Sequence, residues 1–342
     1  MRAAVFTGPG QPLALREVPD PVPGKGELLV KVAGCGLCHT DLHYLDHGVA
    51  TAHPPPLILG HEISGTVVGE GEGAHGPKTA SHVLLPAVIP CGECSLCRTG
   101  RGNICSKMRM FGNHIDGGFA ELVVAPAQEV IPLPPEVPLV RGSIIADAIS
   151  TPYHAVVNRA AVRAGEWVVV VGCGGVGINA VQIAAAIGAQ VIAVDLNPTK
   201  LKAAAHLGAV ETINAAQTPD LAKAVRSITG EGADVAFEAV GTPTTVASAV
   251  STLRRGGRLC LIGYSAQSAP LPLNKIMFLE YTIMGSLGCR PVDYPKVVDL
   301  VRRGKVRLDP VISSEVPLAR IEDALRQIRS GEGFRTIVVP AP

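Results

Sequence analysis

Residues 167–177 read WVVVVGCGGVG, and this stretch decides the fold expected for the second half of the chain. A continuous apolar run bounded by glycine is typical of a buried parallel strand, and residues 176–189 that follow have helical character. Gly172, Gly174 and Gly177 form G-x-G-x-x-G at the turn between them. The first glycine permits a tight turn, the second lets the backbone approach a pyrophosphate, and the third lets helix and strand pack closely. The stretch therefore predicts a dinucleotide-binding turn.

The residues around this turn indicate which dinucleotide it would hold. Gly175 and Val176 open the expected helix, whose free N–H groups and positive end favour phosphate. Asp195 ends the next expected strand, 191–196. Its carboxylate would accept hydrogen bonds from a ribose diol and repel a 2′-phosphate, so we expect NAD rather than NADP. The alternative is a glycine turn in a parallel sheet that binds nothing.

The pattern downstream of the turn alternates strand and helix with short connections. Such alternation is the signature of a doubly wound α/β sheet. Further strands are expected at 233–241 and 258–264, and helices at 198–208 and 244–257.

The chain before about residue 145 has a different character, with many prolines and glycines and short β-like runs. It predicts an irregular β domain. The last part offers helices at 293–305 and 321–331 and a final strand at 335–340, which would pair with the first domain. We therefore expect one domain from 1–148 with 290–342, and a second from 149–289.

Composition narrows the class of protein. Of 342 residues, 47% are hydrophobic and 17% charged, so material for a core is ample. The formal net charge of +1 argues against a nucleic-acid partner. The longest apolar runs are too short to span a bilayer, and the N-terminus lacks the apolar segment of a signal peptide. We expect a soluble cytoplasmic protein without a membrane partner.

Four of the nine cysteines fall close together, at 91, 94, 97 and 105. In a reducing compartment such a cluster indicates a metal site rather than disulfides. Four thiolates at this spacing can surround one tetrahedral Zn²⁺, and a closed site of this kind is structural. We expect Cys91, Cys94, Cys97 and Cys105 to stiffen a lobe at about 90–106 that has no core of its own.

A second group of polar residues is spread along the first domain. Cys38 lies in GLCHTDLH, and His61 follows 23 residues later in GHE. Asp147 is the single charge in SIIADAISTPYHA, residues 143–155, where burial is expected. A buried carboxylate is costly without a partner, although a helix cap or a surface position would also account for it.

In their order and separation, GLCHTDLH, GHE, the cysteine cluster and GCGGVG resemble the zinc-containing alcohol dehydrogenases of the medium-chain dehydrogenase/reductase superfamily. The resemblance covers essentially the whole chain. It implies a GroES-like irregular β catalytic domain and a Rossmann cofactor domain. It also implies a catalytic zinc on Cys38, His61 and a third ligand six residues before Tyr153. That position is Asp147, where the family usually has cysteine; Glu62 is an alternate ligand.

The reaction implied by the resemblance is reversible hydride transfer between a small-molecule alcohol and NAD, with two Zn²⁺ per chain. Zinc would acidify the bound alcohol and polarise the carbonyl. Thr40 would contact the alcohol oxygen and pass its proton, through the cofactor ribose, to His43. Asp41 would hydrogen-bond the distal nitrogen of His61 and fix its tautomer.

Further roles carried over from the family concern the cofactor and the assembly. Thr151, one helical turn after Asp147, would touch the nicotinamide, and Arg335 would reach the pyrophosphate. His39 stands where members of the family carry a phosphate-contacting arginine. Relatives are dimers or tetramers, and we expect a homotetramer, with residues 282–288 as a candidate edge for pairing between subunits.

The substrate is expected to be a secondary, cyclic or aromatic alcohol. The segments around the cysteine cluster and Asp147 are also similar to 6-hydroxycyclohex-1-ene-1-carbonyl-CoA dehydrogenases, which makes a cyclic hydroxyacyl-CoA thioester the alternative. The basic residues available for such a substrate are Arg98, Arg101, Lys107 and Arg109. A zinc-independent quinone reductase or a non-catalytic dinucleotide-binding protein is a remoter alternative.

Overall fold

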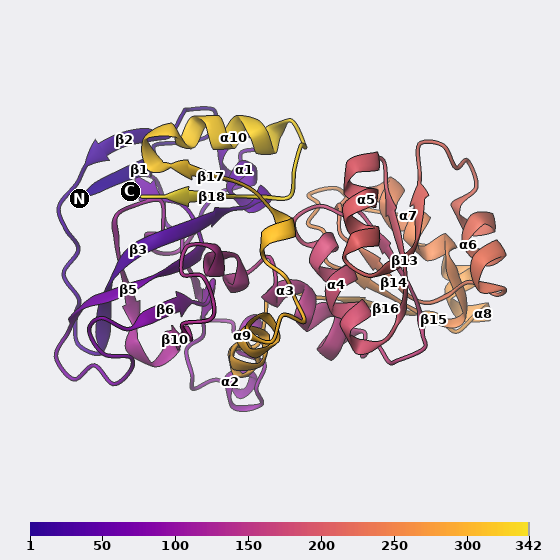
Figure 1. The fold of residues 1–342 in the computed structure, drawn as a ribbon, viewed down its shortest axis with the longest axis horizontal. Helices are drawn as coiled ribbons and strands as arrows, with labels where there is room; N and C mark the ends of the chain where they lie inside the picture. The colour runs from indigo at the N-terminus through magenta and orange to yellow at the C-terminus, as the bar shows by residue number, and fades with distance from the viewer. Residues whose placement is uncertain (341–342) are drawn as a thin grey trace. The chain divides into compact units, whose positions relative to one another are not determined.

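The computed structural model describes residues 1–340, and within it the chain forms two compact units (Figure 1). The first unit contains Met1–Ser150, Gly288–Gly304 and the chain from Leu308 onward. The second contains Thr151–Leu287 and Lys305–Arg307. Residues 341–342 of the expected first domain lie outside the described residues.

The first unit is built on β-sheets. Its largest sheet has the order β10-β6-β5-β3-β18-β17, with β9 also paired to β3. A three-stranded sheet has the order β2-β1-β4, and β7 pairs with β8. The strands of this unit are β1 (Arg2–Phe6), β2 (Ala14–Glu17), β3 (Glu27–Leu37), β4 (Leu57–Ile58), β5 (Glu62–Glu70), β6 (His82–Leu85), β7 (Val88–Ile89), β8 (Arg109–Met110), β9 (Leu122–Pro126), β10 (Ile131–Pro132), β17 (Ile312–Pro317) and β18 (Arg335–Val339).

The helices of the first unit are few and mostly short. They are α1 (His39–Leu45), α2 (Ser95–Arg98), α9 (Tyr294–Arg302) and α10 (Ile321–Arg329), with 3₁₀ turns η1 (Gly102–Ile104), η2 (Ala127–Glu129), η3 (Arg141–Ala146), η5 (Pro291–Asp293), η6 (Asp309–Val311) and η7 (Leu318–Arg320). The last strand, β18, pairs antiparallel with β3 and parallel with β17, which confirms the pairing expected for residues 335–340.

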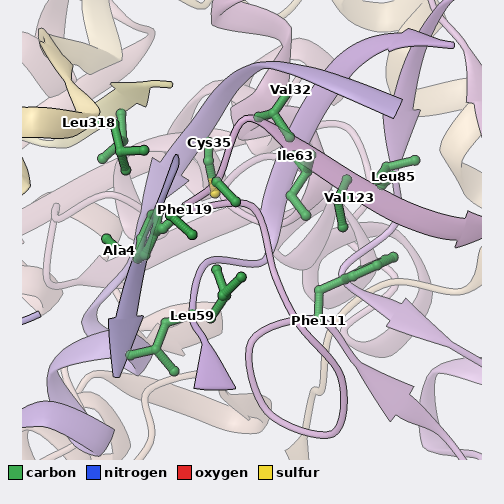
Figure 2. Close-up of a cluster of buried hydrophobic side chains, with 14 of the residues drawn as sticks. Ala4, Val32, Cys35, Leu59, Ile63, Leu85, Phe111, Phe119, Val123 and Leu318 are labelled. Atoms are coloured by element: carbon green, nitrogen blue, oxygen red, sulfur yellow. The ribbon is translucent and has the colours of Figure 1, made fainter. Parts of the chain in front are cut away.

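One apolar core fills the first unit. Its members come from residues 3–130 and from the C-terminal residues 316–338, as Ala4, Phe119 and Leu318 in Figure 2 illustrate. Cys35 of β3 lies opposite Ile63 of β5, and both side chains are fully buried. Burial of this kind contributes about 25 cal/mol per Å² of apolar surface, so the two strands are held firmly where each approaches the polar centre described below.

The second unit contains a six-stranded sheet in which all pairs are parallel, in the order β13-β12-β11-β14-β15-β16. In chain order this is 3-2-1-4-5-6, the doubly wound Rossmann arrangement. Its strands are β11 (Trp167–Val171), β12 (Gln190–Asp195), β13 (Ala209–Asn214), β14 (Ala233–Glu238), β15 (Leu253–Leu261) and β16 (Thr282–Gly285). The expected fold class is confirmed.

Helices cover this parallel sheet because both faces of its buried strands are apolar. α4 contacts α5, and α6 contacts α7 (Figure 1). The helices are α3 (Ser150–Tyr153), which spans the boundary of the two units, α4 (Gly177–Ile187), α5 (Pro198–His206), α6 (Leu221–Thr229), α7 (Pro243–Ser251) and α8 (Leu273–Phe278), and η4 (His154–Arg159) is a π-helical turn.

Three local expectations differ from the structure. The helix expected at 244–257 ends at Ser251, and β15 already begins at Leu253, which pairs with Ala233 of β14. The register is irregular over the arginine–glycine segment, and regular pairing resumes at Arg258. The strand β13 and the helices α6 and α8 have no counterpart among the expected elements. Residues 305–307, expected in the first domain, belong to the second unit, where Gln182 bonds both backbone groups of Arg307. No helix in the described part of the chain is long and apolar enough to cross a membrane.

Candidate catalytic centre and metal sites

Cys38 marks the point where β3 ends and α1 begins. It caps α1 with an extended backbone, and its N–H donates to Asp41 Oδ2 at 2.9 Å. Asp41 is the third residue of the helix, so its carboxylate closes a capping box and also stabilises the positive end of the helix. Thr40 Oγ1, from the first turn of the same helix, lies 3.7 Å from the Cys38 sulfur.

His61 directly precedes β5, which pairs with β3, so the strand register brings it beside Cys38. The ring is buried, with 2% of its surface exposed. Its Nε2 lies 3.8 Å from Asp147 Oδ2, and its Nδ1 lies 3.8 Å from Asp41 Oδ1. The second distance is an ion-pair distance and is too long for a hydrogen bond. Asp41 therefore faces the distal nitrogen without bonding it.

Asp147 enters the same centre from the turn after η3. Its backbone has φ −141°, so it does not continue a helix into α3. The expected relation of Asp147 and Thr151 as neighbours on one helical face is therefore wrong, because three turn residues separate the two helical segments. Thr151 is buried in α3.

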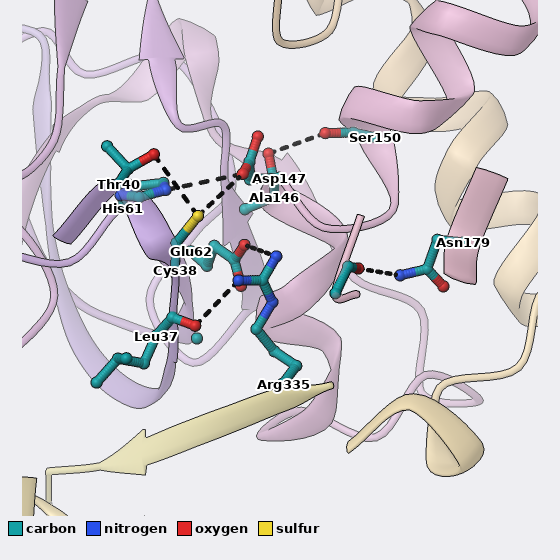
Figure 3. Close-up of polar contacts among 12 residues, drawn as sticks. Leu37, Cys38, Thr40, His61, Glu62, Ala146, Asp147, Ser150, Asn179 and Arg335 are labelled. Carbon is teal, nitrogen blue, oxygen red and sulfur yellow. Dashed lines mark hydrogen bonds and ion pairs between the residues drawn. The ribbon is translucent and has the colours of Figure 1, made fainter. Parts of the chain in front are cut away.

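The three potential ligand atoms converge, as Figure 3 shows. Cys38 Sγ and Asp147 Oδ2 are 3.9 Å apart, close to the 3.8 Å that separates His61 Nε2 from the same oxygen. Tetrahedral zinc with bonds of about 2.0–2.3 Å places its ligand atoms about 3.3–3.8 Å apart. The donor set of one thiolate, one imidazole and one carboxylate, at these separations, fits a zinc ion.

Electrostatics support a cation at this position. Burial works against protonation of His61, but the Asp147 carboxylate, Cys38 and Asp41 outweigh it, so the pKa of His61 is raised well above its usual value. Several anionic groups thus crowd one buried imidazole. A divalent ion would neutralise the same charge in place of a proton.

Glu62 belongs to the same cluster of ligand-type atoms, but its nearest charged partner is Arg335. Arg335 Nη2 lies 3.2 Å from Glu62 Oε1, and Nη1 donates to the carbonyl of Leu37 at 3.0 Å. Burial raises the pKa of Glu62 even though Arg335 opposes it. A methyl group at Gly36 would lie 1.9 Å from Glu62 Oε2, so the glycine makes room for this carboxylate.

The four clustered cysteines form a second candidate metal site. The sulfur of Cys97 lies 3.4 Å from that of Cys94 and 3.9 Å from that of Cys91, and Cys94 and Cys105 are 3.8 Å apart. These distances exclude disulfides, whose S–S bond is about 2.05 Å, and match the edges of a zinc–thiolate tetrahedron. Backbone N–H groups of Cys94 and Glu93 lower the pKa of Cys91 to about 6, which favours the thiolate that a metal requires.

The glycine turn lies between β11 and α4. Gly172 has φ +91°, a backbone conformation that favours glycine, and a methyl group on Gly177 would lie 1.8 Å from the Gly172 oxygen. A methyl group on Gly174 would meet nothing within 4 Å, so the middle of the turn is open. Asp195 Oδ2 accepts from the Cys173 N–H at 2.7 Å, and Oδ1 accepts from Asn197 N–H at 2.8 Å. The carboxylate thus ties the end of β12 to the turn.

Comparison with known proteins decides the family. Residues 24–135 match the alcohol dehydrogenase GroES-like domain, and residues 175–303 match the zinc-binding dehydrogenase domain. An alcohol dehydrogenase of Geobacillus stearothermophilus is 35% identical over 97% of this chain and 96% of its own. This chain belongs to the zinc-dependent, medium-chain alcohol dehydrogenase family. It is an oxidoreductase.

Two further proteins of this family are similar to the chain over nearly its whole length. An L-threonine 3-dehydrogenase of Bacillus licheniformis is 33% identical, covering 98% of both chains. A solved NAD-dependent alcohol dehydrogenase superposes with a TM-score of 0.93 at 29% identity, covering both chains completely. Members of the family act on small molecules.

The remaining residues expected in the site differ in burial and in the element that carries them. His39 is exposed at the start of α1, and Thr40 and His43 are half-buried on that helix. Arg335 is buried on β18, held by Glu62 and Leu37, and its Nε has no hydrogen-bond partner among the described residues. Its expected contact with a cofactor pyrophosphate stays a prediction.

Two features of the dehydrogenase site were not foreseen. The Tyr294 hydroxyl donates to the Ala146 carbonyl at 2.8 Å, and Ser150 Oγ donates to the same carbonyl at 2.9 Å, so a residue from far along the chain anchors the turn that carries Asp147. His47 lies 3.0 Å from His43. The four-residue spacing of the two histidines was a signal for the second contact; no sequence signal marks the first.

Proposed function

We propose that this dehydrogenase oxidises an alcohol reversibly to a ketone or aldehyde with NAD, using Cys38, His61 and Asp147 to hold a catalytic zinc. The observation that carries the proposal is that Asp147 Oδ2 lies 3.9 Å from the Cys38 sulfur and 3.8 Å from His61 Nε2, with all the ligand atoms of the cluster within 4.8 Å of one another. Zinc held there would acidify an alcohol hydroxyl and polarise a carbonyl. NAD would accept the hydride, and the protein would orient the two partners.

The residues around this centre divide the remaining tasks. Cys38 thiolate and Asp147 carboxylate supply two negative charges, and His61 supplies a neutral nitrogen. Thr40, whose hydroxyl lies 3.7 Å from the Cys38 sulfur, stands where it could hydrogen-bond the alcohol oxygen. His43 accepts the proton that the alcohol loses. Glu62 stays paired with Arg335 and is an alternate ligand rather than a resident one.

The four-cysteine lobe holds, in this proposal, a second zinc with no open position. This zinc would have a structural task, because the helical segments of the lobe have no apolar core of their own. No residue of α2 is buried, and the buried residues of η1 are Gly102 and Asn103. All nine cysteines are free of disulfides, which fits an enzyme of a reducing, cytoplasmic compartment.

For the cofactor we propose NAD rather than NADP. The open glycine turn suits a pyrophosphate, and the Asp195 carboxylate at the end of β12 would repel a 2′-phosphate. We expect kcat/KM to favour NAD by at least about 10²-fold, because juxtaposed like charges cost several kcal/mol. Asp195→Ser should reduce this preference; a wild-type enzyme that prefers NADP would contradict the assignment.

The substrate class follows from the relatives' names and from the alcohol chemistry of the centre. Carbon 3 of L-threonine carries a secondary alcohol, and we propose a secondary, cyclic or aromatic alcohol for this enzyme as well. Nothing in the positions of Arg98, Arg101, Lys107 and Arg109 favours a CoA thioester, since all four lie in or beside the cysteine lobe and Lys107 is paired with Glu93.

The test is a screen of NAD reduction over simple, cyclic and aromatic alcohols and hydroxyacyl-CoA thioesters, together with a zinc count. We expect NADH formation with alcohols and two zinc ions per chain. Activity with thioesters alone would replace the proposed substrate. A single zinc per chain without activity would overturn the catalytic centre.

We also propose that the enzyme is a homotetramer, with a dimer as the alternative. β16 is the edge strand of the parallel sheet, and neighbouring α8 exposes Leu273, Met277 and Phe278, each more than 60% accessible. An open edge beside exposed apolar side chains favours association. Light scattering during gel filtration measures the assembly directly, and a monomeric mass would refute it.

A further inference from the structure

His43 and His47 are in direct contact at the end of α1. Their Nδ1 atoms are 3.0 Å apart, and their ring centroids are 5.2 Å apart with the planes tilted by 47°. At this distance one Nδ1 carries the hydrogen and the other accepts it. His43 is half-buried, whereas His47 is exposed.

The backbone after α1 creates this contact. The helix ends at Leu45, and Gly48 adopts φ +66°, which turns the chain back. The Val49 N–H then donates to the His43 carbonyl at 3.0 Å and closes the turn. Because these bonds fix both ends of a five-residue segment, His47 is held over His43 rather than free in solvent.

A second element fixes the same turn. Both carboxylate oxygens of Asp46 accept hydrogen bonds at 2.8 Å from Arg329 of α10. Arg329 also lies 3.9 Å from Glu322 on that helix. The Asp46 carboxylate beside the histidine pair is thus bound to Arg329, and positive charge on His47 would help Arg329 to keep the pKa of Asp46 low.

We propose that His47 is the last proton carrier of the alcohol oxidation, taking from His43 the proton that the substrate hydroxyl releases and delivering it to solvent. This inference rests on the proposed function. It extends the proton path by one residue beyond His43. The proton on the half-buried imidazole of His43 then reaches solvent through a defined residue, the exposed His47.

The proton balance is simple. Oxidation of an alcohol removes two electrons and one proton as hydride and leaves a second proton to be released. That proton arrives on the ring nitrogen of His43 opposite Nδ1, and the Nδ1 hydrogen of His43 moves to Nδ1 of His47. His47 then loses the hydrogen on its own opposite nitrogen to water. Each imidazole gains one proton and loses one, so neither ring is changed after a turnover except in tautomer.

Electrostatics favour onward transfer. Burial lowers the pKa of His43. A His43 imidazolium is thus less stable than one in water, and near neutral pH the proton is passed on rather than retained.

The test uses three variants in pre-steady-state alcohol oxidation at about pH 7, in dilute buffer. His47→Ala and His47→Gln should each slow proton-limited NADH formation by about tenfold, below the full 10²–10⁴-fold of general acid–base catalysis because water substitutes in part. Free imidazole should restore the His47→Ala rate. His75→Ala, at an exposed histidine without a role here, should behave as wild type.

A double variant distinguishes a path in series from a local structural effect. If the proton passes through both rings, His43→Ala/His47→Ala should be no slower than His43→Ala alone, since residues acting as one unit are non-additive. The slowing should also diminish as pH rises, because hydroxide then removes the proton directly. Melting temperatures verify that each variant is folded.

Three results would overturn the inference: wild-type rates in both His47 variants, full recovery in His47→Gln, which keeps a hydrogen bond but cannot carry a proton, or losses that add in the double variant. Failure of the proposed function looks different, since the wild-type enzyme would then form no NADH from any alcohol.

Discussion

Arg335 and Glu62 form a buried ion pair directly behind the candidate catalytic centre, with 3.2 Å between Nη2 and Oε1 and neither residue more than 3% exposed. The pair joins β18 to β5 across β3, and the Leu37 carbonyl holds the guanidinium from the strand between them. Arg335 thereby balances the negative charge of Glu62, so this carboxylate does not need a metal ion as its partner.

Removing one partner of this pair should be costly. Arg335→Ala leaves a buried carboxylate uncompensated, and we expect the free energy of unfolding to fall by about 3–5 kcal/mol. Urea denaturation measures this. Arg303→Ala, which breaks an exposed pair with Asp299, is the matched control and should cost less than about 1 kcal/mol. If Arg335→Ala lowered the free energy of unfolding by no more than Arg303→Ala does, the buried pair would contribute little to stability.

The identity of the third metal ligand can be tested by exchange of donors. Asp147→Ala should abolish alcohol oxidation and lower the zinc count by one, whereas Asp147→Cys retains a negatively charged ligand and should keep both ions. Elemental analysis of purified protein gives the count. Glu62→Gln serves as the control and should keep both zincs; loss of one zinc in this variant instead would make Glu62 the resident ligand.

The cysteine lobe should lose its metal independently of the catalytic centre. Cys105→Ala removes a buried sulfur that lies 3.8 Å from Cys94, so we expect one zinc instead of two and faster proteolysis within residues 91–105. Cys260→Ala, at a buried thiol of the second unit, should retain both ions. Unchanged metal content in Cys105→Ala is incompatible with a four-cysteine site.

Two glycines of the glycine turn between β11 and α4 should respond oppositely to alanine. Gly177→Ala places a methyl group 1.8 Å from the Gly172 oxygen, so α4 must shift, and we expect about 1–3 kcal/mol of destabilisation. Gly174→Ala meets no atom within 4 Å and should fold normally, yet weaken NADH binding because the methyl group occupies the open middle of the turn. Thermal unfolding and NADH fluorescence titration separate the effects. Tight NADH binding by Gly174→Ala would place the pyrophosphate elsewhere.

The Asp46–Arg329 pair predicts a pH dependence of stability. Hydrogen bonds from Arg329 lower the pKa of Asp46 below its unfolded value of about 3.9. Because the folded pKa is depressed, the stabilisation is complete above the unfolded value and disappears as pH falls through the folded one. Both side chains are substantially exposed, so Arg329→Ala should cost under about 1 kcal/mol near neutral pH. The difference between the two proteins should shrink in acid; a difference that grows there contradicts the pairing.

Much of the parallel sheet could be predicted from the local pattern of apolar residues and glycines. The valine run and the glycine turn at 167–177 have one plausible structure, and the strands and helices that follow repeat with regular spacing. The errors fell on segments whose local composition was ambiguous. Residues 253–257 continue a helical pattern but belong to β15, whose first residue, Leu253, pairs with Ala233 of β14, because tertiary contacts override weak local preference.

The two candidate metal sites also differ in how far local sequence predicts them. Cys91, Cys94, Cys97 and Cys105 lie within fifteen residues, so their spacing alone predicts that they meet. Asp147 is 109 residues from Cys38, and only the family resemblance, counted from Tyr153, selected it. The helical relation assumed for Thr151 was wrong because the turn at Asp147 is invisible to periodicity.

By itself, the sequence determined the class of each unit, the glycine turn and the cysteine lobe, because these depend on residues close together in the chain. Tertiary structure alone decided that Tyr294 anchors the turn carrying Asp147 and that Arg335 neutralises Glu62. Such contacts depend on strand register and on the packing of a shared core. Neither of these leaves a periodic signal in the order of the residues.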